Sequence, residues 1–400
     1  MKTELNEQKI SDILNRGTEE IFIKEHLEAS LMSKKRLRVK YGIDPTGPSI
    51  HLGRASTLRK VKAFQDIGHQ VVLVIGDFTA RIGDPSDKLE KRPMLSKEDV
   101  EENMKEYIPV LGKILDIDRT EIRYNSEWLK ELRADEIMEL AESFTVQQMS
   151  ARRNFKERIL KGQEISVREF MYPLLQGYDS FAVRADVEIG GLDQLFNLKA
   201  GRVIQRHYGQ PEQDILTTSM LSGTDGQKMS TTLGNVINIT EKPNDIFGKI
   251  MSINDNLIEK YFILATDMPI NEIKQIISEN KNPRDQKIIL AKEIVRVFYG
   301  DDFADEAKKY FISVFSKKEI PTNIDEIKAK ENETLNEVLL RLGTVSSKGE
   351  LRRLIDGSSV HDLDNGEIIK DADIVFKNPK TIKIGKKKFI KIYPYNRPVA

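Results

Sequence analysis

The strongest constraint on the fold is a strand–helix–strand pattern near the start of the chain. LRVKYGI (37–43) favours a β-strand and ends at the Asp44–Pro45 turn. Apolar residues at helical spacing follow, and VVLVIGDF (71–78) is a continuous apolar run typical of a buried parallel strand. Two strands joined by one helix form a βαβ unit, in which the strands are parallel and the crossover is right-handed.

The alternation of strands and helices continues to about residue 235. Strands are predicted at 121–125, 185–191 and 214–220, and helices at 126–144 and 192–209, while residues 3–30 carry helical spacing. Such alternation predicts an α/β fold with a doubly wound parallel sheet. Sheets of this kind bind ligands beyond the carboxyl ends of their strands, near the point where the strand order reverses.

The strand pattern stops after about residue 235. Helices are predicted at 243–255, 257–265, 270–279, 284–299 and 302–315. The polar stretch 316–333 is typical of a linker, and two short helices and several β-prone pieces follow it. We therefore expect three domains: an α/β domain over 1–235, an α-helical domain over 236–325 and a small α+β domain over 332–400.

Composition narrows the possible functions. The chain has 63 basic and 63 acidic residues, so any contact with nucleic acid must come from local patches. One such patch is the segment 377–400, which is basic and contains no acid. The absence of cysteine excludes disulfides, thiolate metal sites and a cysteine nucleophile. The five histidines form no HExxH pattern, so no protein-held metal is expected.

The sequence gives no sign of a membrane segment. Its first residues lack the apolar core of a signal peptide. No run approaches the roughly 18 apolar residues that a membrane span needs. We therefore expect a soluble, cytoplasmic protein without a membrane partner.

The first candidate site is DPTGPSIHLGR (44–54), where a turn opens a helix. A helix N-terminus attracts phosphate through its unpaired N–H groups. His51 and Arg54 lie three residues apart and can both donate hydrogen bonds to anionic oxygens. Gly53 leaves room for a flat group against the backbone, and Thr46 adds a hydroxyl. The stretch is compatible with a nucleotide-phosphate site, although a four-residue pattern taken alone more often marks an ordinary capped helix.

The second candidate site is LSGTDGQKMSTTLGN (221–235), a Gly-, Ser- and Thr-rich loop after the last predicted strand. Its lysine, Lys228, could close over a polyphosphate and follow charge as it moves to a leaving group. An ordinary polar loop is the alternative. Two such stretches in one α/β domain favour nucleotide chemistry over two unrelated surface features.

HLGR and KMSTT resemble the HIGH and KMSKS signatures of class I aminoacyl-tRNA synthetases. Further stretches resemble the tyrosyl-tRNA synthetases, closest to their second bacterial subtype: GDFTARIGDPSDK (76–88), NSEWL (125–129), EFMYPLLQGYDS (169–180) and ADVEIGGLDQLFN (185–197). The segment from residue 335 onward resembles an RNA-binding module named after a small-subunit ribosomal protein. The resemblance covers essentially the whole chain. It implies a Rossmann-type catalytic domain, an anticodon-side helical domain and a ribosomal-protein-like RNA-binding domain.

The resemblance implies a tyrosine–tRNA ligase. Such an enzyme activates L-tyrosine with ATP to tyrosyl-adenylate and pyrophosphate, and then transfers tyrosine to the 3′ end of tRNA(Tyr). Catalysis requires positioning and stabilisation of phosphate charge rather than a protein nucleophile. Mg²⁺ would accompany ATP as part of the substrate, without a tightly bound cofactor. Two alternatives are a tyrosine-activating paralogue with a non-tRNA acceptor and a weakly catalytic RNA-binding relative.

The resemblance also implies roles for individual residues, with His51, Arg54 and Lys228 as the catalytic groups. ATP binding falls to Thr46, His51, Gly53, Arg54, Lys88, Arg92, Gly190, Gly191, Asp193, Lys228, Met229, Ser230, Thr231 and Thr232. Tyrosine binding falls to Asp84, Asn125, Tyr172, Gln176, Asp179 and Gln194, with Asp179 on the substrate hydroxyl. RNA binding falls to Lys348, Arg352, Arg353, Lys386, Lys387 and Lys388. A solvated charge cluster is the alternative for Lys88 and Arg92, and a structural carboxylate is the alternative for Asp84.

The chain departs from the family pattern at three positions. Arg54 stands where the first signature ends in histidine, and Thr231 stands where the second has its second lysine. Lys40 stands where many members carry a tyrosine that touches the substrate hydroxyl. Neighbouring strand residues face opposite sides, so Tyr41 is no simple substitute. The family also implies a homodimer, with an interface around residues 125–165.

Overall fold

The computed structural model describes residues 6–33, 35–47, 49–86, 95–230, 233–316, 324–385 and 388–395. It separates into two compact units, Met1–Lys308 and Lys309–Ala400. The predicted division into three domains therefore stays a prediction for the boundary near residue 235. Each unit is described below by itself.

A six-stranded sheet forms the centre of the first unit. Its strands are β1 (Thr18–Phe22), β2 (Arg38–Ile43), β3 (Gln70–Ile75), β4 (Glu121–Tyr124), β5 (Val187–Gly191) and β6 (Asp214–Thr218), in the order β1-β6-β5-β2-β3-β4. β2 to β6 are parallel to one another. The chain moves outward from β2 to β4 and then crosses to β5 on the other side of β2. The strand order thus reverses between β2 and β5, as the doubly wound prediction requires.

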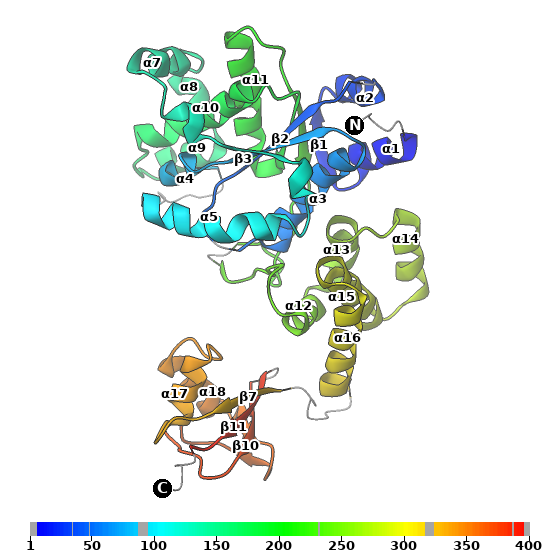
Figure 1. Cartoon of the computed structure of the whole chain (residues 1–400), viewed down its shortest axis with the longest axis vertical. Helices are drawn as coiled ribbons and strands as arrows, with labels where there is room; N and C mark the ends of the chain where they lie inside the picture. The colour runs from blue at the N-terminus through cyan, green and yellow to red at the C-terminus, as the bar shows by residue number, and fades with distance from the viewer. Residues whose placement is uncertain are drawn as a thin grey trace. The chain divides into compact units, whose positions relative to one another are not determined.

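Helices cover both faces of this sheet (Figure 1). They are α1 (Glu7–Asn15), α2 (Lys24–Met32), α3 (Leu52–Asp66), α4 (Thr79–Ile82), α5 (Lys97–Leu111), α6 (Ser126–Leu129), α7 (Ala134–Glu142), α8 (Val146–Ser150), α9 (Arg153–Leu160), α10 (Val167–Ala182) and α11 (Leu195–His207). β3 is buried along Val71–Ile75, which is why its sequence is apolar without alternation. The α/β fold class is confirmed.

Two local predictions need correction. The residues 3–30 are not helical throughout, because β1 interrupts them and pairs antiparallel with β6 at the edge of the sheet. TEEIF alternates too little to reveal this strand, and its pairing partner lies about 200 residues away. The predicted helix 126–144 is two helices, α6 and α7, separated at Lys130–Arg133. Periodicity alone did not reveal that break.

Two basic side chains link α3 to α1, and the end of α1 to the helical region that follows the sheet. The Lys60 ammonium of α3 donates to carbonyls at the end of α1, at 2.7 Å to Ile13 and 2.6 Å to Arg16. The Arg16 guanidinium in turn donates to the carbonyls of Thr266 and Met268, just after α13 (Ile258–Ala265), at 2.7 Å each. Carbonyls at helix ends lack partners within the helix, so both cations satisfy them. Helix α3, which begins at HLGR, is therefore firmly anchored.

The helical region after residue 235 agrees with the sequence prediction. Its helices are α12 (Pro243–Met251), α13, α14 (Ile270–Glu279), α15 (Pro283–Tyr299) and α16 (Asp301–Ser316). α12 and α13 pack against α15, and α13 also packs against α3. Within the described residues, no helix is long and apolar enough to cross a membrane.

The second unit is a small α+β module. Its elements are β7 (Asp325–Lys328), α17 (Leu335–Arg341), α18 (Lys348–Asp356), β8 (Val360–Asp362), β9 (Glu367–Ile368), β10 (Lys380–Ile384) and β11 (Lys388–Tyr393). The helices pack on the sheet around one apolar core, to which α17 contributes Leu335 and β11 contributes Ile392. β7 falls inside the stretch 316–333 that was predicted to be a linker, and it pairs parallel with β11. The linker prediction is therefore wrong for residues 325–328.

Candidate active site

A cavity of about 670 Å³ opens at the carboxyl ends of β2 and β5, where the strand order reverses. The structure brings most of the predicted site residues to its walls. These are Thr46, His51, Gly53, Arg54, Asp84, Tyr172, Gln176, Asp179, Gly190, Gly191, Asp193, Gln194, Lys228, Met229 and Ser230. Lys88, Arg92, Thr231 and Thr232 lie outside the described residues, as do Lys386 and Lys387.

His51 is the N-cap of α3. Its backbone is extended, and its Nδ1 accepts a hydrogen bond from the Arg54 backbone N–H at 3.3 Å. Burial lowers the pKa of His51 to about 4, and the charges of Arg54 and Lys228 act in the same direction. The imidazole is therefore neutral near pH 7. Because Nδ1 accepts, the ring proton resides on Nε2 and can be donated.

The Arg54 side chain is held by two hydroxyls. One guanidinium nitrogen donates to the Tyr107 hydroxyl of α5 at 2.6 Å, and another donates to the Thr46 hydroxyl at 3.3 Å. Tyr107 is fully buried. Arg54 thus presents a fixed cation at the start of α3, in the place where the family signature ends in histidine.

The two signature stretches touch each other. The Gly53 backbone N–H donates to Met229 Sδ at 3.4 Å, across 176 residues of sequence. A Cβ on Gly53 would lie 3.1 Å from His51 Nδ1 and 3.7 Å from Met229 Sδ, so a larger residue would crowd the imidazole. HLGR and the described part of KMSTT, Lys228–Ser230, therefore form one surface of the cavity, which is called the HLGR–KMSTT surface below.

Lys228 and Asp193 form an ion pair on this surface. Lys228 Nζ lies 3.0 Å from Asp193 Oδ2, and both side chains are partly exposed. Asp193 leaves no room for a side chain at Gly191, where a Cβ would lie 2.5 Å from Asp193 Oδ1. Gly191 of GGLDQ thus makes space for this carboxylate at the end of β5.

Another part of the cavity wall is a buried carboxylate, Asp179 of α10. It is 3% exposed and accepts hydrogen bonds from Trp128 Nε1 at 2.8 Å and Asn125 Nδ2 at 3.3 Å. Burial raises the pKa of Asp179 to about 7, while the Lys40 charge and these two donors oppose the rise. Asn125 does not line the cavity; it is fully buried and lies behind Asp179, with a further bond to Thr79.

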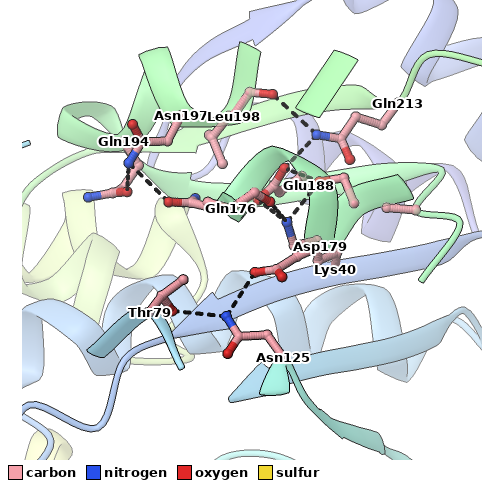
Figure 2. A network of polar contacts seen from close by, with 12 residues as sticks. Lys40, Thr79, Asn125, Gln176, Asp179, Glu188, Gln194, Asn197, Leu198 and Gln213 are labelled. Carbon is pink, nitrogen blue, oxygen red and sulfur yellow. Dashed lines mark hydrogen bonds and ion pairs between the residues drawn. The ribbon is translucent and has the colours of Figure 1, made fainter. Parts of the chain in front are cut away.

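A polar cluster around Asn197 forms the adjoining wall. Asn197 Nδ2 lies within hydrogen-bonding distance of Gln176 Oε1 (2.9 Å) and Gln194 Oε1 (3.0 Å). Gln194 Nε2 donates to Asp84 Oδ2 at 2.7 Å. Asn197 thus orients both glutamine amides (Figure 2), and the Gln194 amide also bonds the Asp84 carboxylate. Tyr172, on the same helix as Gln176, donates its hydroxyl to Asp44 Oδ2 at 2.9 Å.

Sequence reasoning missed several side chains that hold the site together. Asn197 and Trp128 lie inside the quoted stretches 185–197 and 125–129, so their place beside recognised residues was the available signal. Arg152, in the predicted interface region 125–165, is buried between the rings of Phe155 and Phe196, and it donates to Asn197 Oδ1 at 3.0 Å. No local signal pointed to the contact of Arg152 with Asn197, which is 45 residues away in the sequence.

Comparison with known proteins places this geometry in a family. The profile of "tRNA synthetases class I (W and Y)" matches residues 32–316, which is more than half of the chain. This chain belongs to that family. The synthetase is 47% identical to the tyrosine–tRNA ligase of Carboxydothermus hydrogenoformans, over 95% of this chain and 97% of the relative. It is 44% identical to the tyrosine–tRNA ligase of Thermotoga maritima, over 95% of this chain and 96% of the relative.

Solved structures support the fold of the synthetase. A C-terminally truncated mitochondrial tyrosyl-tRNA synthetase from Aspergillus nidulans matches with a TM-score of 0.65 at 23% identity, covering 77% of this chain and 94% of that one. A tyrosyl-tRNA synthetase from Archaeoglobus fulgidus, solved in complex with L-tyrosine, matches with a TM-score of 0.60 at 21% identity, covering 76% and 99%. The fold of the first unit is thus that of class I synthetases.

Two surfaces of the synthetase lie outside the cavity. In the second unit, the predicted RNA-binding residues Lys348, Arg352 and Arg353 are exposed on α18, and Lys388 is exposed on β11. In the first unit, large apolar side chains are exposed on α7 to α10. They are Met138 (69% exposed), Val146 (68%), Ile159 (51%), Leu160 (78%) and Val167 (75%).

Proposed function

We propose that this synthetase is a tyrosine–tRNA ligase, which activates L-tyrosine with ATP and transfers it to tRNA(Tyr). The observation that carries the proposal is that one cavity contains both the HLGR–KMSTT surface and the buried carboxylate Asp179. The HLGR–KMSTT surface suits a nucleoside triphosphate, and the Asp179 carboxylate suits a phenol hydroxyl. The near full-length relatives quoted above, which are named tyrosine–tRNA ligases, support the same conclusion.

Asp179 would accept the hydrogen bond of the substrate hydroxyl. A carboxylate can accept more hydrogen bonds than the two it receives from Trp128 and Asn125. Phenylalanine in the same place would cover this polar group without pairing it, which costs free energy. Asp179 is therefore the proposed group that selects tyrosine over phenylalanine.

Asp84, Gln176 and Tyr172 would hold the α-ammonium group of tyrosine. A cation needs acceptors, and these side chains supply a carboxylate, an amide oxygen and a phenol oxygen. Gln194 would lie near the substrate carboxylate, because its amide already bonds Asp84. These contacts would leave the tyrosine carboxylate directed toward the HLGR–KMSTT surface.

ATP would bind between the two signatures. The ribose hydroxyls would pair with Asp193, and the phosphates would face His51 Nε2–H, Arg54 and Lys228. The tyrosine carboxylate attacks the α-phosphorus in line, the bond to the bridging oxygen breaks, and pyrophosphate leaves with the charge. The three donors stabilise that charge as it develops. Mg²⁺ would be held mainly by phosphate oxygens and water, since the described residues include no group of three or more metal-binding side chains.

The tRNA and the second subunit would use the remaining surfaces. The helical region 236–325 would face the anticodon side, and the basic residues of α18 and β11 would contact RNA phosphates. The exposed apolar side chains of α7 to α10 would be buried between two subunits of a homodimer. A cytoplasmic location agrees with this role and stays a prediction.

The test is ATP–pyrophosphate exchange driven by tyrosine, followed by charging of tRNA(Tyr) in the same reaction. Both are expected to be positive. Exchange without charging would instead support the paralogue with another acceptor. Absence of exchange by the folded protein would support the weakly catalytic RNA-binding relative.

A further inference from the structure

Lys40 and Glu188 face each other across the point where the strand order reverses. They are register partners in the parallel pair β2–β5, and both side chains are fully buried. Lys40 Nζ lies 2.8 Å from Glu188 Oε1. This ion pair occupies the position where the sequence comparison expected a substrate-contacting tyrosine.

The ammonium of Lys40 also holds one turn of α10. It donates to the Gln176 carbonyl at 2.9 Å and to the Ser180 hydroxyl at 2.7 Å. With Glu188 as its ion-pair partner, the ammonium therefore has three polar neighbours. The contacts bracket Asp179, which lies between Gln176 and Ser180 on the same helix.

Glu188 is fixed from its other side. Its Oε2 accepts hydrogen bonds from the Ser180 hydroxyl at 2.9 Å and from the Gln213 amide. Gln213 Nε2 also reaches the Leu198 carbonyl at 3.2 Å. Figure 2 shows the resulting chain of contacts, which runs from Gln213 through Glu188 to Lys40 and ends beneath Asp179.

Stability alone is a weak reason for such a pair. The desolvation of two buried charges costs about as much as their attraction returns, and apolar residues of similar volume often serve as well. A buried ion pair beside a proposed substrate group therefore calls for another explanation.

The charges around Asp179 supply that explanation. The Lys40 charge favours the ionised carboxylate, whereas Glu188 disfavours it. The other groups that face Asp179 are the neutral donors Trp128 and Asn125. Farther round the cavity lie Tyr172, whose pKa is raised by burial and then by Asp44, and Asp44 itself. Lys40 is thus the cation that most favours the ionised form of Asp179, the carboxylate proposed to accept the substrate hydroxyl.

We infer that the Lys40–Glu188 pair is a specificity-determining positioning device: it fixes the Gln176–Ser180 turn of α10 and sets the charge of Asp179 for the tyrosine hydroxyl. The inference rests on the proposed function, and it assigns Lys40 no contact with the substrate. In this chain a buried ion pair performs, through Asp179, the task that a tyrosine at this position performs by touching the substrate.

The test compares Lys40→Met with Glu188→Gln in tyrosine-dependent pyrophosphate exchange. The acidic limb of the kcat/KM profile reports the ionisation of Asp179 in the free enzyme. Loss of the cation is expected to move this limb to higher pH by about one unit, and loss of the anion to move it to lower pH. A purely structural pair would not move the limb in opposite directions.

Two further variants keep the inference testable if a single change prevents folding. Lys40→Met/Glu188→Gln is electrically neutral, and it is expected to fold and to lower the ratio of kcat/KM for tyrosine to that for phenylalanine by at least tenfold, about 1.4 kcal/mol. Lys60→Met removes another buried lysine, one that bonds carbonyls at the end of α1 and is not among the charges acting on Asp179, and it should leave both the limb and the ratio unchanged. Two results would overturn the inference: an unchanged ratio of kcat/KM for tyrosine to that for phenylalanine in the double variant, or acidic limbs that shift in the same direction in the two single variants. If wild-type protein lacks tyrosine-dependent exchange, the proposed function fails instead.

Discussion

Replacement of His51 can separate its two roles at the start of α3, which are to cap the helix and to donate a hydrogen bond to ATP. The imidazole caps the helix through Nδ1, which accepts from the Arg54 backbone N–H. The same ring would donate to ATP phosphate through Nε2. Asparagine is a favoured N-cap whose side-chain oxygen can replace Nδ1, but it has no group at the reach of Nε2. His51→Asn should therefore keep the cap and lose the donor, whereas His51→Ala should lose both.

The geometry gives the expected sizes. Loss of one fixed donor to developing phosphate charge costs about 2.7–4 kcal/mol, so His51→Asn should lower the rate of adenylate formation by roughly 10²–10³-fold. Its free energy of unfolding should stay within about 0.5 kcal/mol of wild type. His51→Ala should show a similar loss of rate and an additional loss of stability of about 1 kcal/mol.

Single-turnover formation of tyrosyl-adenylate measures the rate, and urea unfolding measures the stability. Because the pKa of His51 is lowered to about 4, the wild-type rate should show no titration of this ring between pH 6 and 8. A wild-type rate in His51→Asn would refute the donor role. Equal losses of stability in the asparagine and alanine variants would refute the cap.

Four other outcomes are expected. Gly53→Ala should slow adenylate formation, because the new Cβ would lie 3.1 Å from His51 Nδ1 and displace the ring; an unchanged rate in the exchange assay would argue against this reading. Glu169→Gln breaks the buried ion pair with Arg158 (Nη1–Oε1 2.6 Å) and should lower the free energy of unfolding in urea by about 3–5 kcal/mol. Its control is Glu157→Gln in the exposed pair with Arg153, which should lower it by less than about 1 kcal/mol. Similar losses in both variants would contradict the role of burial. The pKa of Asp179 is about 7 in the folded protein against an ordinary 3.8, so the folded state binds more protons than the unfolded state between these pH values. As pH rises from about 4 to about 7, the unfolding free energy of wild type should therefore fall relative to that of Asp179→Asn. Parallel curves for the two proteins would count against a buried, protonatable Asp179. Leu160→Asp, at a side chain that is 78% exposed, should convert a homodimer into monomers in sedimentation, and a persistent dimer would locate the interface elsewhere.

Local sequence patterns determined much of this protein. The β-prone run at 37–43 and the apolar run at 71–78 predicted parallel strands, and these are β2 and β3. The turn before His51 predicted the start of α3, whose N-cap is His51 itself. Strand and helix periods, caps and turn residues act over a few neighbouring positions, and so they can be recognised without knowledge of the fold.

The recognised motifs also located the cavity, because residues at the carboxyl ends of parallel strands converge wherever the order of the strands reverses. Asp179 and Gln176 were expected to share one pocket, and both line it. What the motifs could not give was the support behind them. Asn197 orients the Gln176 amide, and Arg152 holds Asn197, through contacts that span 21 and 45 residues of sequence.

Only the tertiary structure shows which residue pairs with Lys40. In the sequence it is a departure from the family pattern on a strand that should be apolar. Its partner, Glu188, is 148 positions away and becomes adjacent only when β5 pairs with β2 in one particular register. Strand order and register depend on the packing of the whole sheet, which no short stretch encodes. They place Lys40 opposite Glu188 and beside the turn of α10 that carries Asp179.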